Sequence, residues 1–298
     1  MLVSTQTEHL AAKFSQETAI RMLADAGYEA FDLSLFSMLN DDDPFNSDEY
    51  LALARHLRAV AEECGIVCNQ AHAPFPSSKG NQAFNETIFA RIVRAMEIAA
   101  TLGAGIIVVH PVQHLYYPEH VQELKEMNHT FYTALAPYAE KFGIRVALEN
   151  MFQGDPRRHV LIESTCNSPD EFCAYLDALP NEQFTACLDI GHCGLVGQDA
   201  ANFIRALGHD RLGALHVHDN DHHHDLHTMP FMGALNWDSI TTALADIRYA
   251  GDITLEADRF MTSLPEHALP EAAHLMCTVA KHLRDEVLRK MGKSPGAV

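Results

Sequence analysis

The chain has 298 residues, 47% of them apolar, and its 40 acidic against 21 basic side chains give a formal net charge of −19. Such a surface repels phosphate backbones, and no run of lysine and arginine forms a local basic patch, so we expect no nucleic-acid partner. A membrane span would need about 18 consecutive apolar residues; no such stretch occurs, so we expect no membrane partner.

Short apolar or β-branched runs alternate with longer amphipathic segments along the whole chain. Eight runs have the length and composition of strands that are buried on both faces. In chain order they are Leu2–Thr5, Ala30–Leu35, Ile66–Ala71, Ile106–His110, Arg145–Glu149, Thr185–Asp189, Gly213–His218 and Ile253–Glu256. The helical segments include Asp48–Glu63, Glu86–Leu102, Val121–Phe142, Pro169–Leu179, Ala200–Leu207, Trp237–Arg248 and a long closing helix, Glu271–Arg289.

Strands that alternate with helices, without a linker-like change of composition, predict a parallel α/β fold. Glycines follow the helical segments, where a left-handed cap is favoured: Gly27, Gly65, Gly103, Gly143 and Gly251. A doubly wound sheet would carry a glycine-rich phosphate loop after its first strand, and none follows Thr5. We therefore predict one domain, residues 1–298, folded as a single (β/α)8 barrel with a long C-terminal helix and a frayed tail.

Metal-competent side chains stand at or beside the ends of six consecutive predicted strands. In chain order they are His72, His110, Glu149, Asp189 (with His192 three residues beyond), His218 and Glu256. In a (β/α)8 barrel the carboxyl ends of all strands meet at one rim, which is where the chemistry of such barrels is located. Imidazole and carboxylate oxygen are ligands of zinc, manganese and cobalt, so the sequence predicts a divalent-metal site at this rim.

These residues differ in how strongly each of them indicates a metal site. Glu149 and Glu256 end apolar strands, where a carboxylate is rarely buried unless it is paired or bound to a metal. A single histidine such as His72 or His110 could instead be a hydrogen-bonded core residue. Strand alternation sends His216 and His218 to the same face, one layer apart. His218 lies nearer the barrel mouth, so we expect it to be the metal ligand.

Two further features leave alternatives open. The segment HVHDNDHHHDLH, residues 216–227, is rich in histidine, but such tracts can also be solvated, which we expect for residues 221–224. The seven cysteines are odd in number and include no CxxC pair, and no signal peptide precedes them, which predicts reduced thiols in a cytoplasmic protein. Cys187 and Cys193 flank Asp189 and could be thiolate ligands, although core packing is the simpler interpretation.

Several motifs follow one another along the chain: AHAPF, VVHP, ALEN, LDIGH, HVHDND followed by DLH, and TLEAD. In this order they resemble the motifs of the xylose-isomerase-like barrels, which include sugar isomerases, epimerases and the endonuclease IV group. The resemblance covers nearly the whole chain. It implies that Glu149, Asp189, His218 and Glu256 hold one divalent ion, with manganese, zinc, cobalt and magnesium all compatible. It implies that His192, and also His72, contact the substrate. In endonuclease IV relatives the residues that match His72, His110, His192, Asp225 and His227 hold two further metals.

The resemblance favours a metal-dependent isomerase or epimerase acting on a sugar or sugar phosphate, in which Glu149 and Glu256 transfer protons through a metal-stabilised enediolate. The alternative is a multinuclear zinc phosphoesterase of the endonuclease IV type; a third possibility is a sugar sensor or a structural barrel without catalysis. Relatives are often dimers or tetramers, which makes a homo-oligomer possible, but no apolar stripe in this sequence specifies an interface, so the oligomeric state stays open. One segment departs from the sugar isomerases: PFMGALNW, Pro230–Trp237, has Phe231 in place of a glycine and Asn236 in place of an aspartate. We therefore expect a reshaped loop near the substrate.

Overall fold

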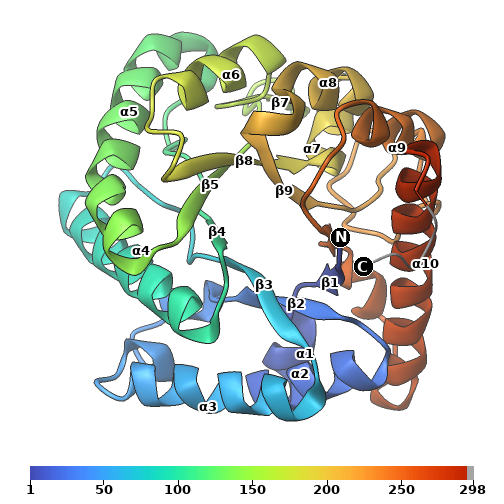
Figure 1. The fold of residues 1–298 in the computed structure, drawn as a ribbon. Coiled ribbons are helices and arrows are strands. Elements are labelled where there is room, and N and C mark those ends of the chain that lie inside the picture. The colour runs from blue at the N-terminus through green and yellow to red at the C-terminus, as the bar shows by residue number, and fades with distance from the viewer. Residues whose placement is uncertain (294–298) are drawn as a thin grey trace.

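The computed structural model describes residues 1–293, and it confirms the predicted alternation of strands and helices. Eight parallel strands form a ring that is surrounded by helices (Figure 1). The strands of the ring are β1 (Val3–Thr5), β2 (Ala30–Ser34), β3 (Val67–His72), β4 (Ile106–Val108), β5 (Arg145–Glu149), β8 (Phe184–Asp189), β9 (Leu212–His216) and β10 (Ile253–Leu255). All eight predicted strands are therefore present, with small differences at their ends.

Backbone pairing between the first and last strands closes the ring. Strands β2, β3, β4, β5, β8 and β9 form one six-stranded sheet, and β1 pairs in parallel with β10. Single parallel bridges join this pair to the two ends of the sheet, Gln6 to Asp32 and Val217 to Leu255. The fold is thus the predicted (β/α)8 barrel, and the doubly wound alternative is wrong.

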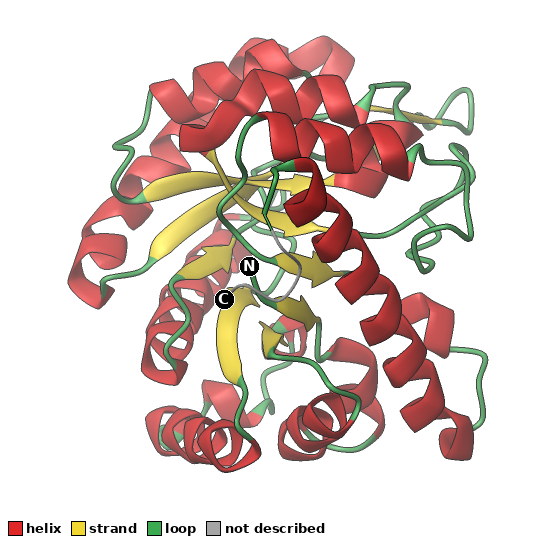
Figure 2. Ribbon diagram, turned by 45° about the vertical axis from the view of Figure 1, so that its right-hand side comes forward, coloured by secondary structure: helices red, strands yellow, loops and turns green. Residues whose placement is uncertain are grey.

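The helices form the outer layer, with the strands inside it (Figure 2). They are α1 (Glu8–Lys13), α2 (Gln16–Asp25), α3 (Tyr50–Cys64), α4 (Gln82–Leu102), α5 (Tyr117–Phe142), α6 (Pro169–Asp177), α7 (Ile190–Leu195), α8 (Ala200–Arg211), α9 (Trp237–Asp246) and the long C-terminal α10 (Leu269–Lys290). Within the described part of the chain, no helix is long and apolar enough to cross a membrane. The predicted fraying of the tail falls mostly on residues 294–298, outside the described residues.

Short elements at the rim were not predicted. After β5 the chain forms an antiparallel hairpin of β6 (Phe152–Gly154) and β7 (Leu161–Glu163). Four 3-10 turns complete the structure: η1 (Phe36–Leu39), η2 (Pro44–Asn46), η3 (Asp258–Met261) and η4 (Glu266–Ala268). These three- and four-residue elements are too short to produce a periodic pattern in the sequence.

The glycine caps are confirmed with one exception. Gly65, Gly103 and Gly143 end α3, α4 and α5 with φ of 73°, 97° and 65°. Gly251 does not adopt a positive φ; an added Cβ there would lie 2.3 Å from the hydroxyl oxygen of Tyr249. This position therefore needs a glycine because the chain passes close to a side chain, and not because a helix ends there.

The barrel interior has two different halves just below the rim. On β4, β5, β8 and β9 the layer consists of a small apolar cluster, Val108, Ala147, Cys187 and Ala214. On β1, β3 and β10 the corresponding residues are polar and hydrogen-bonded: Ser4 Oγ donates to Thr254 Oγ1 (2.8 Å), and Thr254 Oγ1 donates to Gln70 Oε1 (3.3 Å). Side chains two residues further along these strands point into the rim above this layer.

Candidate metal centre

The carboxyl ends of the strands surround a cavity of about 470 Å³ at the mouth of the barrel. Four of the predicted residues are nearly inaccessible to solvent: Glu149, Asp189, His218 and Glu256. His72, His110, His192, Asp225 and His227 line the cavity together with the two glutamates. The structure thus brings all nine predicted site residues to the same rim, although they come from positions between residues 72 and 256.

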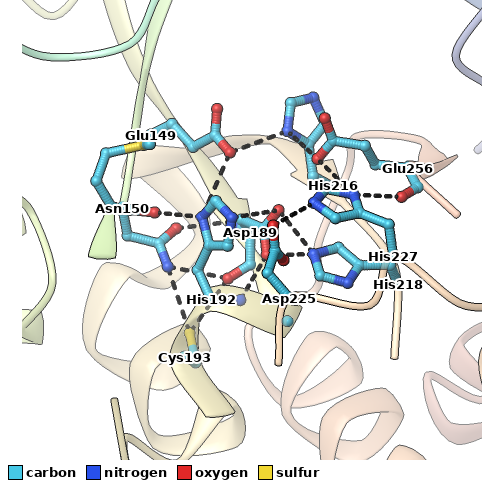
Figure 3. A network of polar contacts seen from close by, with 12 residues as sticks. Glu149, Asn150, Asp189, His192, Cys193, His216, His218, Asp225, His227 and Glu256 are labelled. Carbon is cyan, nitrogen blue, oxygen red and sulfur yellow. Dashed lines mark hydrogen bonds and ion pairs between the residues drawn. The ribbon is translucent and has the colours of Figure 1, made fainter. Parts of the chain in front are cut away.

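Three carboxylates and one histidine converge at the centre of this site (Figure 3). His216 Nδ1 lies 3.2 Å from Glu149 Oε1 and 3.1 Å from Glu256 Oε2. One ligand atom from each of Glu149, Asp189, His216 and Glu256 lies within 4.8 Å of the others. This spacing lets the four side chains reach one ion.

His218 lies in a second group, beside the first. Its Nε2 is 3.0 Å from Asp189 Oδ1, and its ring stacks on that of His227 with centroids 4.1 Å apart. The potential ligand atoms of His192, His218, Asp225 and His227 form a cluster of their own. The sequence analysis favoured His218 over His216 for the central group; the structure puts His216 there. The ring of His218 instead lies against Gly191 at the start of α7, where an added Cβ would be 2.0 Å from its Cε1.

A third group adjoins the first through a shared carboxylate. His110 Nε2 lies 3.1 Å from Glu149 Oε2, and His72 Nε2 lies 3.5 Å from the same oxygen. These three residues form a third cluster whose members are close enough to share an ion, and His72, His216 and Glu256 form a fourth, overlapping one. Glu149 is therefore the residue common to the two groups.

Backbone contacts fix the tautomers of three of these histidines. The Nδ1–H groups of His72, His192 and His227 donate to the carbonyl oxygens of Ala73, Asn150 and Glu256, each at 2.8 Å. His227 Nε2 lies 3.0 Å from Asp225 Oδ2; burial alone would lower the pKa of His227, but this contact raises it to about 10. In neutral rings of His72 and His192 the other nitrogen, Nε2, keeps its lone pair. This is the arrangement in which histidine binds a metal, with its second nitrogen held by a hydrogen bond.

The central carboxylates have no permanent positive partner. Within residues 1–293, Glu149, Asp189 and Glu256 form ion pairs with histidines alone. Burial alone would raise the pKa of Glu149, but His216 and His110 hold it well below its usual range. Burial raises the pKa of Glu256 to about 8, against the opposing effect of His216. One oxygen of each glutamate, Oε2 in both, is buried without a hydrogen-bond partner.

These observations fit a bound divalent cation. Buried ionised carboxylates are costly unless a charge compensates them, and the Oε2 atoms of Glu149 and Glu256 each have a histidine nitrogen at 3.1 Å but no hydrogen bond. Asp225 Oδ1 and His218 Nδ1 are likewise buried without partners. The donor set of carboxylate oxygens and imidazole nitrogens suits manganese, cobalt or zinc.

The cysteines near the site are not candidates for ligands. Cys187 belongs to the apolar layer below the rim, where burial raises the pKa of its thiol to about 12. The thiol of Cys193 donates to the carbonyl oxygen of Asp189 at 3.3 Å, and burial raises its pKa as well. Among the described residues, neither cysteine belongs to a group of side chains close enough to share an ion, so the interpretation as core packing is favoured over metal ligation.

The sequence analysis gave no role to Asn150, although it belongs to the ALEN motif. Its side chain accepts a hydrogen bond from the backbone N–H of Asp189 at 2.7 Å and donates to the carbonyl oxygen of the same residue at 2.9 Å. It thereby clamps the end of β5 to the end of β8, so that Glu149 and Asp189 keep their relative positions. The motif itself was the available signal, since Asn150 directly follows the glutamate.

The two loop predictions can also be compared with the structure. Residues 221–224 are exposed, and Asp221 caps the turn that they form. The segment Pro230–Trp237 does not line the cavity; it is tied to Asp219, which accepts from the indole N–H of Trp237 at 2.8 Å and from the N–H of Phe231 at 3.0 Å. Phe231, at the position where the resemblance implied a glycine, adopts a positive φ of 74°. Aromatic side chains from other loops, Phe36, Phe75 and Phe152, line the cavity instead.

Comparison with known proteins agrees with this architecture. The family described as xylose isomerase-like TIM barrel matches residues 20–278. The uncharacterized protein MJ1311 of Methanocaldococcus jannaschii is 29% identical over 195 residues, which are 62% of this chain and 62% of that protein. The chain thus aligns with less than two thirds of that relative.

Solved structures share the fold at low sequence identity. A D-tagatose 3-epimerase-like protein superposes with a TM-score of 0.72 at 20% identity, covering 98% of both chains. A D-allulose 3-epimerase from Methylomonas sp., in complex with D-allulose, gives 0.69 at 19% identity and 96% of both chains. The 3-keto-D-glucoside 4-epimerase YcjR from E. coli gives 0.69 at 17% identity, with 93% of this chain and 99% of that chain covered.

Proposed function

Because the chain belongs to the xylose isomerase-like TIM barrel family, we propose that it is a metal-dependent isomerase or epimerase of a small sugar or sugar phosphate. The observation that carries this proposal is the convergence of Glu149 and Glu256 on His216 from β5 and β10, inside a cavity large enough for a small molecule. Two ionisable carboxylates on different sides of one cavity are what a proton transfer at carbon needs. The epimerases among the similar folds support the same reaction class.

In this proposal Glu149, Asp189, His216 and Glu256 hold the divalent ion. When bound, the ion would supply Lewis-acid stabilisation of the negative charge that develops beside the substrate carbonyl, a contribution of several kcal/mol. The sequence-based prediction that His218 is the fourth ligand stays as the alternative. The variants His216→Ala and His218→Ala separate the two possibilities. Only the substitution of the true fourth ligand should abolish tight binding of the first Mn²⁺ equivalent in calorimetric titration.

The two glutamates would move the proton. The one on β5 and the one on β10 approach a substrate in the cavity from different sides, so one can remove a proton from the carbon next to the carbonyl while the other returns a proton to the opposite face. This sequence inverts one carbon centre, as an epimerase does. If a single carboxylate removes the proton and returns it to the former carbonyl carbon, while the hydroxyl proton moves to the former carbonyl oxygen, the carbonyl shifts to the neighbouring carbon, and the enzyme is an aldose–ketose isomerase.

Neighbouring side chains would bind and enclose the sugar. His72 and His192 present their Nε2 atoms to the cavity and can contact substrate hydroxyls. The rings of Phe36 and Phe75 lie against His72, with centroids 4.6 Å and 5.8 Å from it, and that of Phe152 lies 4.9 Å from His192. These apolar walls would exclude water from the reacting carbon, which strengthens every electrostatic interaction there.

The test is Glu149→Gln and Glu256→Gln in a Mn²⁺-supplemented panel of free ketoses, aldoses and their phosphates. Loss of a general base typically lowers turnover by about 10²–10⁴-fold. Both variants should keep the circular dichroism spectrum of the wild type, and Glu62→Gln, an exposed residue on α3, should keep full activity. Turnover like that of the wild type in either site variant would contradict the assignment.

A multinuclear zinc phosphoesterase is the second candidate, and the four overlapping ligand groups at the rim favour it. Metal clusters clamp the attacking and leaving oxygens in phosphoryl transfer. The net charge of −19 argues against a duplex nucleic-acid substrate, and Arg259 is the one arginine or lysine among the residues that line the cavity. Inductively coupled plasma mass spectrometry on untagged protein separates the candidates: one ion per chain supports the isomerase, whereas two or three zinc ions, with cleavage of a phosphoester or nicking at an abasic site, support the phosphoesterase.

A further inference from the structure

A buried carboxylate that the proposed chemistry does not use lies directly beside the central histidine. Asp32, in β2, is fully buried. Its Oδ2 accepts a hydrogen bond from Gln70 Nε2 at 2.7 Å and lies 3.5 Å from His216 Nε2, while its Oδ1 has no hydrogen-bond partner. Among residues 1–293, His216 is the one group capable of positive charge that lies within ion-pair distance of this carboxylate.

Gln70 alone does not explain a carboxylate at this position. The other polar residues of this half of the barrel, Ser4 and Thr254, satisfy one another without any charge, and an asparagine at position 32 could accept the hydrogen bond of Gln70 equally well. A charged oxygen in a fully buried site costs several kcal/mol unless a partner compensates it. The charge of Asp32 is therefore best explained by the imidazole that it faces.

The ring of His216 stands between two sets of carboxylates. Its Nε2 faces Asp32, and its Nδ1 faces Glu149 and Glu256. If Nε2 carries the proton and donates it toward Asp32, a neutral ring has its Nδ1 lone pair directed at the two glutamates. The opposite tautomer would direct Nδ1–H into the position that a metal ion would take.

We propose that Asp32 is a positioning residue: it accepts the Nε2–H of His216, holds the ring in place, and so selects the tautomer whose Nδ1 can bind the divalent ion. The inference rests on the proposed function only in requiring a metal at Glu149 and Glu256. It also favours His216 as the fourth ligand: neither His216 Nε2 nor His218 Nδ1 makes a hydrogen bond in the structure, but of these two atoms, within residues 1–293, only His216 Nε2 has a carboxylate, that of Asp32, within ion-pair distance, at 3.5 Å.

The experiment measures Mn²⁺ binding to metal-free protein by isothermal titration calorimetry for the wild type, Asp32→Ala, Asp32→Asn and the control Ser4→Ala. Loss of the group that holds a ligating histidine typically weakens metal binding about 10–100-fold, which is the expected result for Asp32→Ala. Asp32→Asn keeps an acceptor oxygen without the charge, so its affinity should lie between those of Asp32→Ala and the wild type. Ser4→Ala removes a buried hydrogen bond in the same half of the barrel without touching His216, and should bind Mn²⁺ as the wild type does.

Three outcomes would overturn the proposal: unchanged affinity in a folded Asp32→Ala variant, an equal loss in Ser4→Ala, or no Mn²⁺ binding by the wild type. If Asp32→Ala does not fold, unchanged affinity in Asp32→Asn decides against it in the same way. Failure of the proposed function alone would give a different result. Mn²⁺ binding would still depend on Asp32, but no sugar in the panel would be converted.

Discussion

The contact between Gly191 and His218 gives a prediction whose size can be worked out from the structure. A Cβ at position 191 would lie 2.0 Å from Cε1, 2.4 Å from Nε2 and 2.5 Å from Nδ1 of the imidazole. Carbon atoms in ordinary contact are about 3.5 Å apart, so in Gly191→Ala the ring must move by roughly 1.5 Å. Movement in one direction is blocked by the ring of His227, which is stacked on it at 4.1 Å.

This displacement should break the hydrogen bond between His218 Nε2 and Asp189 Oδ2, which is now 3.2 Å long. Leaving buried polar groups unpaired costs about 1–3 kcal/mol, and overpacking costs about 1–3 kcal/mol. Alanine is favoured over glycine within a helix such as α7 by about 1 kcal/mol, which offsets part of the loss. We expect Gly191→Ala to lower the free energy of unfolding by about 1–5 kcal/mol.

Urea unfolding followed by circular dichroism measures this loss. Gly194→Ala on the same helix is the matched control, since its Cβ would meet only the ends of the Leu235 and His222 side chains, at 2.8 Å and 2.9 Å, which can move aside. In a His218→Ala background, Gly191→Ala should no longer destabilise the protein. An equal loss in both backgrounds, or no loss in the wild-type background, would refute the packing argument.

Three further predictions test other parts of the molecule. Trp237→Phe removes the indole donor to buried Asp219 and should lower the free energy of unfolding in urea by about 1–3 kcal/mol; a loss no larger than that of a surface substitution would count against this role. Burial raises the pKa of Glu171 above its ordinary 4.5, so the folded protein holds this proton more tightly than the unfolded chain, and the resulting stability is present below pH 4.5 and lost as the pH rises through the raised pKa. Glu171→Gln should therefore become more stable relative to the wild type with increasing pH, and a pH-independent difference would contradict the shift. Chelation should lower the melting temperature measured by calorimetry, because an ion present at 100 times its Kd stabilises the fold by about 2.7 kcal/mol; an unchanged transition would argue against a resident metal.

The barrel could be predicted from the sequence because its strands are buried on both faces. Such strands appear as continuous apolar runs, and parallel ones must be separated by long crossovers, here helices. The rim residues followed from the same pattern, since Glu149 and Asp189 stand where apolar runs stop. The rim hairpin β6–β7 could not be predicted, because its three-residue strands, Phe152–Gly154 and Leu161–Glu163, are shorter than any period that a sequence can display.

The sequence could not decide whether His216 or His218 lies in the central group with the carboxylates. Alternation sends both side chains to the same face, and depth along the strand favoured His218. The structure turns the two rings apart through contacts with residues distant in the chain, Asp32 beside His216 and Gly191 beneath His218. Neither neighbour stands in a pattern that links it to the HVH motif, so tertiary contacts decide the direction of each ring.

The pairing of β1 with β10 sets an order of events during synthesis on the ribosome. Residues 3–5 leave the ribosome first but cannot form this edge of the barrel until residues 253–255 have been made. Glu256 follows directly, and its backbone N–H bonds to Val217 only when the ring is complete. A nascent chain can therefore present Glu149, Asp189 and His216 but not all four of the proposed ligands. Under the proposed function, the complete metal site exists only once the last strand of the barrel has been made.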